Sequence, residues 1–373
     1  MNLKDLSALL KLSPTTVSRA LNGYPEVSEA TRMRVQAAAQ LHNYRPNAQA
    51  KRLATGRSMA IGHVIPITTQ HEIVNPVFAD FIAGAGEVYS AHGYDMILSI
   101  VPDNHEERAY REVHAKGNVD GIIVHGPRHS DPRIALLTEL DLPFVVHGRS
   151  SGVKQGYNWV DVNNARSFER ATGLLMDLGH ERIALINGLE TMDFAARRRA
   201  GFENAHVARN LAINPQYMTQ GEMTEGQGAK YARLMLGLTQ PPTAFVTSSL
   251  LSAMGVRRAV EEAGLKIGRD ISIVTHDDEL GYLRNGEAEP VFTATRSSVR
   301  EGGRKAAAML LAQIDARHAG QPLDQHQSIL MEASLVLGRS TGPAPHSLGA
   351  DRTLLPLDGA PRVALITQSV ARD

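Results

Sequence analysis

The stretch 12–23 constrains the fold of this chain more than any other, because both ends of a short helix are marked in it. Ser13 is a good N-cap, since its hydroxyl accepts a hydrogen bond from an otherwise unpaired backbone N–H. Pro14 then suits the first helical position, where its missing N–H has no partner to lose. Gly23 follows as the residue that most easily adopts the left-handed conformation at a helix end. The sequence therefore predicts a short helix between Ser13 and Gly23.

The two faces of this helix differ in chemistry. Val17, Ala20 and Leu21 fall on one face at helical spacing. The remaining positions carry short hydroxyl side chains and one long cation, Arg19. Arginine is the commonest specific reader of guanine, through two hydrogen bonds to its major-groove edge, and hydroxyl side chains suit phosphates or a thymine methyl group. The pattern indicates a recognition helix for DNA, with an ordinary capped surface helix as the alternative.

The flanking sequence favours the DNA-binding interpretation. The segment 3–10 has the pattern of a short amphipathic helix, and Ala20 is small enough to let two helices cross closely, which is the helix-turn-helix geometry. A third helix is expected from Ser28 to about His42, with Glu29 at its positive end. We expect the apolar residues of this helix to close a three-helix core; they are Val35, Ala38, Ala39 and Leu41.

Charge is unevenly distributed along the chain. The 373 residues have a net charge of zero, with 39 Lys or Arg and 39 Asp or Glu. Residues 1–58 hold nine Lys or Arg and three Asp or Glu, a net charge of +6, so residues 59–373 carry −6. A basic head on an acidic body is expected of a nucleic-acid-binding module that is attached to a second domain.

Four ordered motifs give the chain a resemblance to a known family. They are Thr-Thr-Val-Ser-Arg-Ala-Leu-Asn-Gly at 15–23, Val-Ser-Glu-Ala-Thr-Arg at 27–32, Asn-Tyr-Arg-Pro-Asn-Ala at 43–48 and Arg-Leu-Ala at 52–54. In this order and spacing the chain resembles the LacI/GalR family of bacterial transcription regulators, through roughly residue 341. The resemblance implies an all-α helix-turn-helix headpiece and an α/β body like that of periplasmic binding proteins, with two doubly wound parallel-sheet lobes.

The resemblance also implies where DNA is contacted. In the headpiece, residues 1–57, the implied contact residues are Pro14, Thr15, Thr16, Ser18, Arg19 and Asn22. A hinge helix over 47–54, which would fold only on DNA, would add Asn47, Ala50 and Leu53. Leu53 matches the residue that wedges into the minor groove at the operator centre, and two such helices require a homodimer on double-stranded, pseudo-palindromic DNA. The alternative for this short segment is a linker that frays.

From about Met59 the sequence alternates between strands and helices, which predicts parallel sheets with right-handed crossovers. Strands are expected at 60–65, 94–101, 121–125, 143–147, 182–187, 244–247 and 271–276. Helices are expected at 76–92, 103–117, 133–140, 164–178, 196–208, 225–236, 251–263 and 299–318.

The resemblance divides this body, residues 58–341, into two lobes. The first lobe is expected to comprise about 59–160 and 292–325, and the second about 161–291 and 326–341, with crossings near 160, 291 and 325. From Gly342 onward prolines and small polar residues predominate, so 342–373 is expected to be a flexible tail.

The body is expected to bind a small effector between its lobes, where the carboxyl ends of strands meet. The residues that the resemblance places there are Phe78, Arg149, Asn163, Arg198, Ser248 and Asp277. Asp278 is expected to cap a helix or to lie in a surface turn. Ser248 stands where the family commonly has Asn, and Met223 stands where an aromatic residue is frequent, which argues against a purine. A converging Asp and Arg can bind adjacent hydroxyls, so we expect a sugar, for example an α-glucoside or a similar disaccharide.

Several other classes of protein are disfavoured. The chain has no cysteine, so disulfides and thiol catalysis are excluded. No apolar run approaches the ~20 residues needed to span a membrane, and the start of the chain is unlike a signal peptide, so we expect a cytoplasmic protein. The histidines lack metal-ligand spacing and no nucleophile has a readable base beside it, so no enzyme, cofactor or metal site is expected. Two alternatives stay open: a sugar-binding protein without a DNA role, and a regulator that uses a purine or another non-sugar corepressor.

Overall fold

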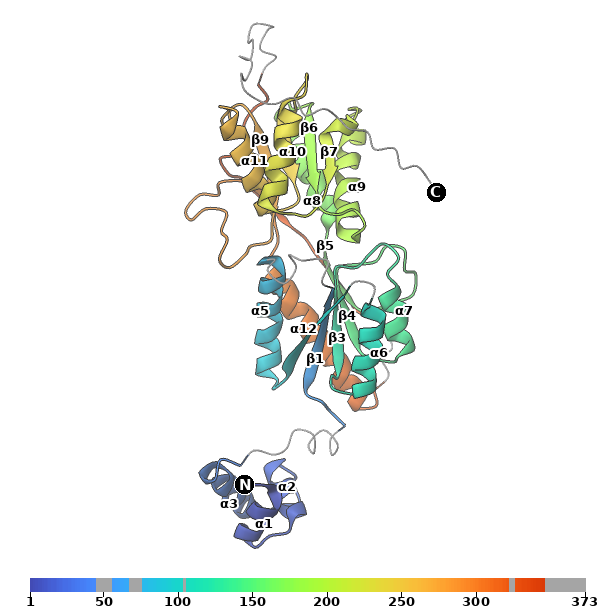
Figure 1. Ribbon diagram of the computed structural model, residues 1–373, viewed down its shortest axis with the longest axis vertical. Helices are drawn as coiled ribbons and strands as arrows, with labels where there is room; N and C mark the ends of the chain where they lie inside the picture. Colours follow the sequence, from blue (N-terminus) through green and yellow to red (C-terminus); the bar gives the residue numbers. More distant parts are fainter. Residues whose placement is uncertain (45–55, 67–75, 103–104, 322–325, 346–373) are drawn as a thin grey trace, which may run out of the picture.

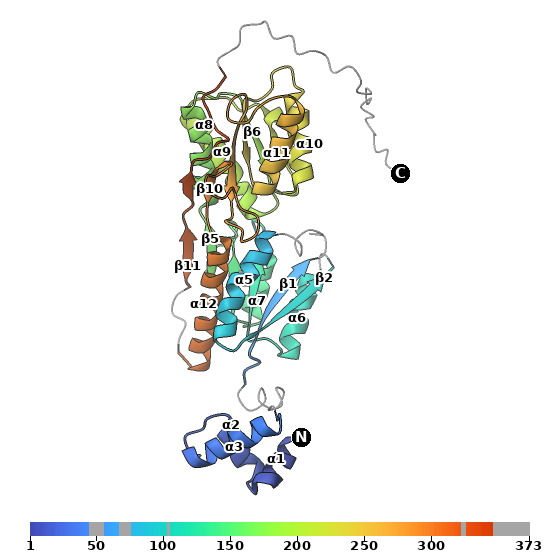
Figure 2. The ribbon, with the colours of Figure 1, turned by 90° about the vertical axis from the view of Figure 1, so that its left-hand side faces the viewer.

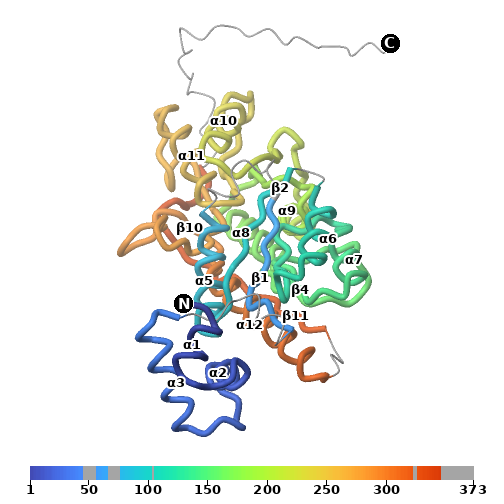
Figure 3. The backbone as a smooth tube through the Cα atoms, turned by 60° about the horizontal axis from the view of Figure 1, so that its bottom comes forward, coloured from blue at the N-terminus to red at the C-terminus, as the bar shows by residue number. Residues whose placement is uncertain are grey.

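The computed structural model describes residues 1–44, 56–66, 76–102, 105–321 and 326–345. It begins with a headpiece of three helices, α1 (Leu3–Leu10), α2 (Pro14–Leu21) and α3 (Glu29–Leu41) (Figures 1 and 3). The side-chain oxygens of Asn2, Ser13 and Ser28 accept hydrogen bonds from backbone N–H groups in the first turns. The predicted helix bounds are confirmed, because these caps are local in the sequence.

The headpiece has a small apolar core. Its buried members are Leu6, Leu10, Val17, Ala20, Val27, Val35 and Ala39. One expectation is wrong, since the side chain of Leu41 is 80% exposed. Leu41 lies two positions after Ala39, which is roughly 200° around the helix axis, and therefore on the side opposite the core.

The first lobe is a sheet with helices on both faces. The strands are parallel and lie in the order β11-β5-β4-β3-β1-β2. They are β1 (Ala60–Pro66), β2 (Asp95–Val101), β3 (Gly121–His125), β4 (Phe144–His147), β5 (Trp159–Val162) and β11 (Ser328–Met331). One face is covered by α5 (Pro76–Ala91) and α12 (Val299–His318), and the other by α6 (Glu106–Lys116) and α7 (Pro132–Glu139) (Figure 1).

The second lobe repeats this architecture. Its strand order is β12-β10-β9-β8-β6-β7, with β12 antiparallel to β10. The strands are β6 (Ile183–Asn187), β7 (Met218–Gln220), β8 (Ala244–Thr247), β9 (Ser272–Asp277), β10 (Thr293–Arg296) and β12 (Ser334–Val336). Helices α8 (Asn164–Asp177) and α9 (Asp193–Ala208) pack on one face, and α10 (Glu225–Leu236) and α11 (Leu250–Glu262) on the other. The structure thus confirms the predicted alternation.

The crossings between the lobes differ in part from the expected positions. The first follows β5, close to the expected residue 160. The second follows β10 rather than residue 291, because β10 pairs with β9 in the second sheet. The third lies between β11 and β12 rather than near residue 325, because β11 pairs with β5 in the first sheet (Figure 2). Short edge strands of this kind have little hydrophobic pattern in their sequence. The strand with which each one pairs therefore determines the lobe to which it belongs.

The start of the expected tail belongs to the second lobe. The backbone N–H of Ala344 donates to the carbonyl of Leu178 at 2.8 Å, and the carbonyl of Gly342 lies 3.1 Å from Nε2 of His180. The body therefore extends past residue 341, and residues 346–373 lie outside the described residues. Within the described ranges, the helices are all too short or too polar to cross a membrane.

Candidate nucleic-acid interface and ligand site

The outward face of α2 carries the headpiece residues that were predicted to contact DNA. The opposite face, with Val17 and Ala20, is fully buried in the headpiece core. The outward residues are Pro14, Thr15, Thr16, Ser18, Arg19 and Asn22, each exposed or partly exposed. The Arg19 guanidinium makes no hydrogen bond or ion pair within the described part of the chain. Its full set of donors is therefore free for a partner.

Two of these outward residues also stabilise the ends of α2. The hydroxyl of Ser13 accepts a hydrogen bond from the backbone N–H of Thr16 at 3.0 Å and lies 2.8 Å from the Thr16 hydroxyl. The amide of Asn22 donates to the carbonyl of Ser18 at 2.9 Å. Thr16 and Asn22 thus make hydrogen bonds at the ends of α2, whereas the side chain of Arg19 makes none to the described residues. The predicted hinge residues Asn47, Ala50 and Leu53 lie outside the described residues.

In the body, Arg198 of α9 is one of the buried members of the predicted ligand contacts, with 6% of its surface exposed. Its Nε donates to Oδ1 of Asn164 at 2.8 Å, and its Nη1 donates to the carbonyl of Ser248 at 2.6 Å. The ring of Phe194 lies 4.9 Å from the guanidinium carbon. Nη2 donates to none of the residues that the structure describes. Burial lowers the pKa of Arg198 to about 10, so the side chain stays charged at neutral pH.

The neighbouring serines and arginines have different partners. Ser248 offers Arg198 its carbonyl, while its hydroxyl donates to Oδ1 of Asn187 at 2.7 Å. Ser249 caps α11 through the backbone N–H of Ser252. Arg199 turns to the surface and pairs with Glu190 and Glu203, so it is a solvated surface residue.

Asp277 and Asp278 follow one another at the carboxyl end of β9, and the structure gives them different roles. Asp277 is 2% exposed. Its Oδ1 accepts a hydrogen bond from the backbone N–H of Glu279 at 2.9 Å, and its Oδ2 accepts one from Nε of Arg296 at 3.1 Å. Asp277, expected to contact the ligand, thus stabilises a turn and holds a neighbouring arginine.

Asp278, which was expected in a plain surface turn, faces the junction of the lobes instead. Its Oδ1 lies 3.5 Å from Nε2 of His276. Burial raises the pKa of Asp278, but His276, Arg198 and His147 outweigh this effect and hold the pKa below its ordinary range. Arg198 and Asp278 come from the second lobe and His147 from the first. Asp278 is therefore close to charged groups of both lobes rather than in an open surface turn.

The first lobe brings histidines to the same junction. Nδ1 of His63 lies 2.9 Å from Nε2 of His125, and the ring of His147 stacks on Phe81 at 4.1 Å. Phe78, which was expected at the ligand site, meets His125 edge-on at 5.1 Å and is partly buried. Burial lowers the pKa of His63 to about 3 and that of His147 to about 4. These imidazoles are therefore neutral at physiological pH.

The predicted contact Asn163 points away from Arg198. Its Oδ1 caps α8 by accepting from the backbone N–H of Arg166 at 3.3 Å, and its Nδ2 donates to Glu332 at 2.8 Å in an exposed position. The next residue, Asn164, is 3% exposed and accepts the hydrogen bond from Arg198. Asn164 rather than Asn163 therefore holds Arg198, because neighbouring residues at the start of a helix project in directions about 100° apart.

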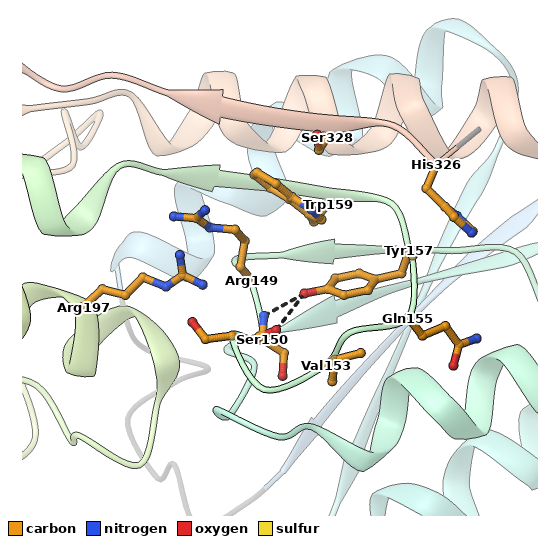
Figure 4. A pocket seen from close by; sticks show the side chains of 11 residues that line it. Arg149, Ser150, Val153, Gln155, Tyr157, Trp159, Arg197, His326 and Ser328 are labelled. Atoms are coloured by element: carbon orange, nitrogen blue, oxygen red, sulfur yellow. Dashed lines mark hydrogen bonds between the residues drawn. The ribbon is translucent and has the colours of Figure 1, made fainter.

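Arg149, also expected at the ligand site, lies apart from Arg198. Its Nε donates to Oδ2 of Asp161 at 2.9 Å, and its guanidinium carbon lies 5.0 Å from the centroid of the Trp159 ring. It lines a separate pocket on the flank of the first lobe together with Arg197 (Figure 4). Asp161 joins the two regions, because its Oδ1 accepts a hydrogen bond from Asn164, which in turn holds Arg198.

Two buried carboxylates connect the lobes directly. Asp193 of α9 accepts hydrogen bonds from the backbone N–H of Ser151 at 2.6 Å and from its hydroxyl at 3.0 Å. Asp80 of α5 accepts one from the backbone N–H of Gly281 at 2.7 Å. Each pair joins a residue of one lobe to a residue of the other, so both contacts depend on the angle between the lobes.

Asn164, Asp278 and His147 were not predicted to lie at the junction of the lobes. A usable signal existed for two of them. His147 ends a predicted strand, and parallel strands present their last residues at the ligand edge of a sheet. Asn164 opens a helix directly after a crossing strand. For Asp278 the sequence offers no such signal, since only the packing of β9 decides which carboxylate of the pair turns inward.

Comparison with known proteins accounts for both regions. Residues 2–47 match bacterial regulatory proteins of the lacI family, and residues 172–341 match the periplasmic binding protein-like domain. The chain is 42% identical to the HTH-type transcriptional regulator AglR of Rhizobium meliloti over 356 residues, which is 95% of this chain and 97% of AglR. It is 30% identical to the HTH-type transcriptional repressor CytR of Escherichia coli (strain K12) over 346 residues, 92% of this chain and 97% of CytR.

Solved structures agree. The lac repressor dimer bound to operator and the anti-inducer ONPF has a TM-score of 0.77 at 25% identity, covering 92% of this chain and 99% of that one. The complex of the transcriptional regulator CelR with cellobiose has a TM-score of 0.67 at 25% identity, covering 91% and 99%. The chain therefore belongs to the LacI family of bacterial transcription regulators and is a DNA-binding regulator rather than an enzyme.

Proposed function

We propose that the protein is a cytoplasmic repressor that binds a pseudo-palindromic operator as a homodimer and is released from it by a small sugar. The free guanidinium of Arg19 on a capped α2 supports the DNA side, as does the likeness to the operator-bound lac repressor dimer. One headpiece offers one short helix to one half-site, so a second copy supplies the other. Asn47, Ala50 and Leu53 would add contacts at the operator centre.

The hinge part of this proposal has its own test. Leu53→Ala should reduce the bending of operator DNA, because an apolar wedge that unstacks a base step is lost, while non-specific binding persists. Gel-shift mobility with permuted operator positions measures the bend. An unchanged bend with the variant would remove Leu53 from the proposal.

The observation that carries the ligand proposal is the meeting of Arg198 and Asp278 with His147 at the junction of the lobes. Arg198 keeps one terminal nitrogen without a partner, Asp278 is a charged acceptor, and the neutral imidazole of His147 can donate and accept. Adjacent sugar hydroxyls donate and accept in the same way, so they match this mixed set. A polar site built for hydroxyls also rejects ligands that lack them.

Within the sugars we propose an α-glucoside or a similar disaccharide. The likeness to CelR, whose solved complex contains cellobiose, supports a disaccharide. Phe78 and Phe194 offer ring surfaces beside the polar groups. Ser248 acts through its carbonyl, which holds Arg198 in place. Asp277 acts by supporting the turn that aims Asp278.

The switch follows from the position of the ligand between lobes. A sugar that contacts both lobes favours one angle between them, and in a dimer this angle sets the spacing of the two hinge segments. Because coupling between sites is reciprocal, operator must change sugar affinity by the same factor by which sugar changes operator affinity.

A thermal-shift screen with maltose, sucrose, cellobiose and related glucosides tests the ligand. We expect one of them to raise the melting temperature, because a ligand that binds only the folded state stabilises it, and to release the operator in a gel shift. Arg198→Ala and Asp278→Asn should lose the shift but keep operator binding, whereas Arg209→Ala, on the surface beside Asp177, should keep both.

Asp277→Asn decides between the two carboxylates. If Asp278 contacts the sugar, Asp278→Asn should weaken the thermal shift more than Asp277→Asn does. Equal responses from wild type, Arg198→Ala and Asp278→Asn would mean that the sugar binds elsewhere.

A purine corepressor is the second candidate, because the ring of Phe194 beside Arg198 offers a stacking surface. Adenosine and guanine therefore belong in the same screen. A thermal shift with a base, accompanied by tighter operator binding, would replace the sugar in this proposal.

A further inference from the structure

A pocket of about 450 Å³ lies on the flank of the first lobe, and Arg198 is not among the residues that line it (Figure 4). Its walls come from the loop after β4, from β5 and from the start of β11, with Arg197 contributed by α9 of the second lobe. This volume is typical of sites for small molecules. Among the described residues no Asp or Glu lines the pocket, whereas Arg149 and Arg197 both do.

The two arginines reach the pocket with donors to spare. Arg149 uses only Nε, for its hydrogen bond to Asp161. Arg197 uses Nε for a hydrogen bond to Asp193, and its Nη1 stands 3.9 Å from the same oxygen of Asp161, beyond hydrogen-bond distance. The terminal nitrogens of both side chains make no hydrogen bond to the residues that the structure describes. In Figure 4 the two guanidinium groups point toward one another from opposite lobes.

The rest of the lining includes uncharged polar side chains and one ring surface. Gln155 and Ser328 supply an amide and an exposed hydroxyl, and Trp159 supplies an aromatic face beside Arg149. The hydroxyl of Tyr157 is occupied, since it accepts a hydrogen bond from the backbone N–H of Ser150 at 2.8 Å. Two forked cations next to neutral hydrogen-bonding groups suit an anionic group carried by a small polyhydroxy molecule.

We propose that this pocket is a second ligand site, which binds the phosphate of a small phosphorylated sugar between Arg149 and Arg197. Guanidinium forks match phosphate oxygens in geometry and charge. Since Arg149 belongs to the first lobe and Arg197 to the second, a phosphate bound by both bridges the lobes. It lies beside the hydrogen bond between Ser151 and Asp193, which also links the two lobes. The site therefore acts on the angle between the lobes.

Hydrogen bonds through Asp161 connect this pocket to Arg198. Its carboxylate is buried, holds Arg149 on one oxygen and accepts from Asn164 on the other. Asn164 in turn holds Nε of Arg198 at 2.8 Å. A phosphate that draws the guanidiniums outward competes with Asp161 for them and so perturbs the support of Arg198. The binding step itself does not depend on which ligand Arg198 takes.

Trp159 makes the binding step directly measurable, because it is the sole tryptophan of the chain and lines the pocket. The probe is glucose 6-phosphate, titrated into the full-length protein while Trp159 fluorescence is followed. Glucose, inorganic phosphate and potassium chloride at matched ionic strength are the comparison titrations. We expect a saturable change with glucose 6-phosphate at millimolar concentration or below and weaker or no change with the other three. Anions that bind the basic headpiece leave this signal unaffected, since Trp159 is in the body.

Variants separate the pocket from the rest of the molecule. Arg149→Gln should weaken binding at least ~10-fold, because it removes charge-assisted hydrogen bonds. Ser328→Tyr should block binding by filling the pocket while the Arg149–Asp161 pair remains. Arg209→Gln, at the C-cap of the helix that holds Arg197 but paired with Asp177, should bind like the wild type.

Several outcomes would overturn the proposal. They are a titration without saturation, an equal affinity in Arg149→Gln and the wild type, and a change that potassium chloride or glucose reproduces. Binding of inorganic phosphate as tight as that of the ester would overturn the assignment to a sugar phosphate. The connection through Asp161 to Arg198 is tested separately, by measuring the sugar response of Asp161→Asn, which we expect to be altered. Failure of the phosphate site and failure of the sugar proposal can therefore be told apart.

Discussion

Arg19 in the headpiece and Arg198 in the body both stand at proposed binding sites, and they differ in how much of their hydrogen-bonding capacity the protein itself uses. Arg19 is exposed and has no partner in the described part of the chain. Arg198 is buried, held by Asn164 and Ser248, and keeps a single terminal nitrogen for a ligand. In the headpiece, the DNA partner has to fix the position of the Arg19 side chain, whereas in the body Asn164 and Ser248 fix that of Arg198 before a ligand binds.

This contrast extends to the two regions as a whole. The headpiece has a small apolar core and carries its function on an outward face with net positive charge. The body buries charged and polar side chains at the junction of two large lobes and satisfies nearly all of their hydrogen bonds with its own groups. We therefore expect the headpiece to respond to ionic strength and the body to respond to pH.

The largest expected effect is that of salt on operator affinity. If the dimer neutralises about 6–10 phosphates, affinity should fall ~10³–10⁵-fold from about 50 to about 200 mM salt, because each phosphate contact releases a counterion. The affinity of the body for an uncharged sugar should change far less over the same range. Filter binding and calorimetry measure the two. An operator complex that is insensitive to salt would contradict the comparison.

The next effect is the loss of body stability at low pH. Burial lowers the folded-state pKa of His147 from 6.5 to about 4 and that of His63 to about 3. As the pH falls below 6.5 the unfolded chain takes up protons first, so stability is present above pH 6.5 and is lost toward pH 4. Each histidine should cost on the order of 1–2 kcal/mol between about pH 7 and pH 5.

Urea unfolding at these pH values, followed by the fluorescence of Trp159, measures the loss. His147→Gln should flatten the dependence on pH, whereas His42→Gln, on the exposed end of the headpiece, should leave it unchanged. A body whose stability does not vary over this range would show that the imidazoles are solvated.

A smaller effect is expected for Arg19→Ala. If Arg19 reads a guanine, loss of its side chain should cost on the order of 1–3 kcal/mol of operator affinity and relax selectivity at one position in each half-site. Since Arg19 has no partner within the described part of the chain, the melting temperature should stay the same. Binding to a panel of operator variants measures the first expectation, and a lower melting temperature would disprove the second.

The smallest effect is expected for Arg199→Ala, one residue from Arg198. Arg199 is paired with Glu190 and Glu203 at the surface and is 44% exposed, so its loss should change stability by no more than ~0.5 kcal/mol. Sugar binding should persist. A loss of sugar binding as large as that of Arg198→Ala would place the ligand on the other side of α9.

The three helices of the headpiece and the long helix α12 were predicted with nearly correct bounds, because caps, prolines and apolar spacing are local signals. The short strands β7, β10, β11 and β12 were not, since they span three or four residues and become strands only by pairing with a neighbour. This is why the second and third crossings between the lobes fall later than expected.

The sequence by itself determined the DNA-reading face of α2, the alternation that produces two parallel-sheet lobes, and the arginine run from which one side chain enters the junction. Only the tertiary structure decided between neighbours: Asn164 rather than Asn163, Asp278 rather than Asp277, and a separate pocket for Arg149 and Arg197. Adjacent side chains diverge by about 100° on a helix and about 180° on a strand. Which of them faces a partner therefore depends on how each element is rotated when it packs, and contacts between residues far apart in the chain set that rotation.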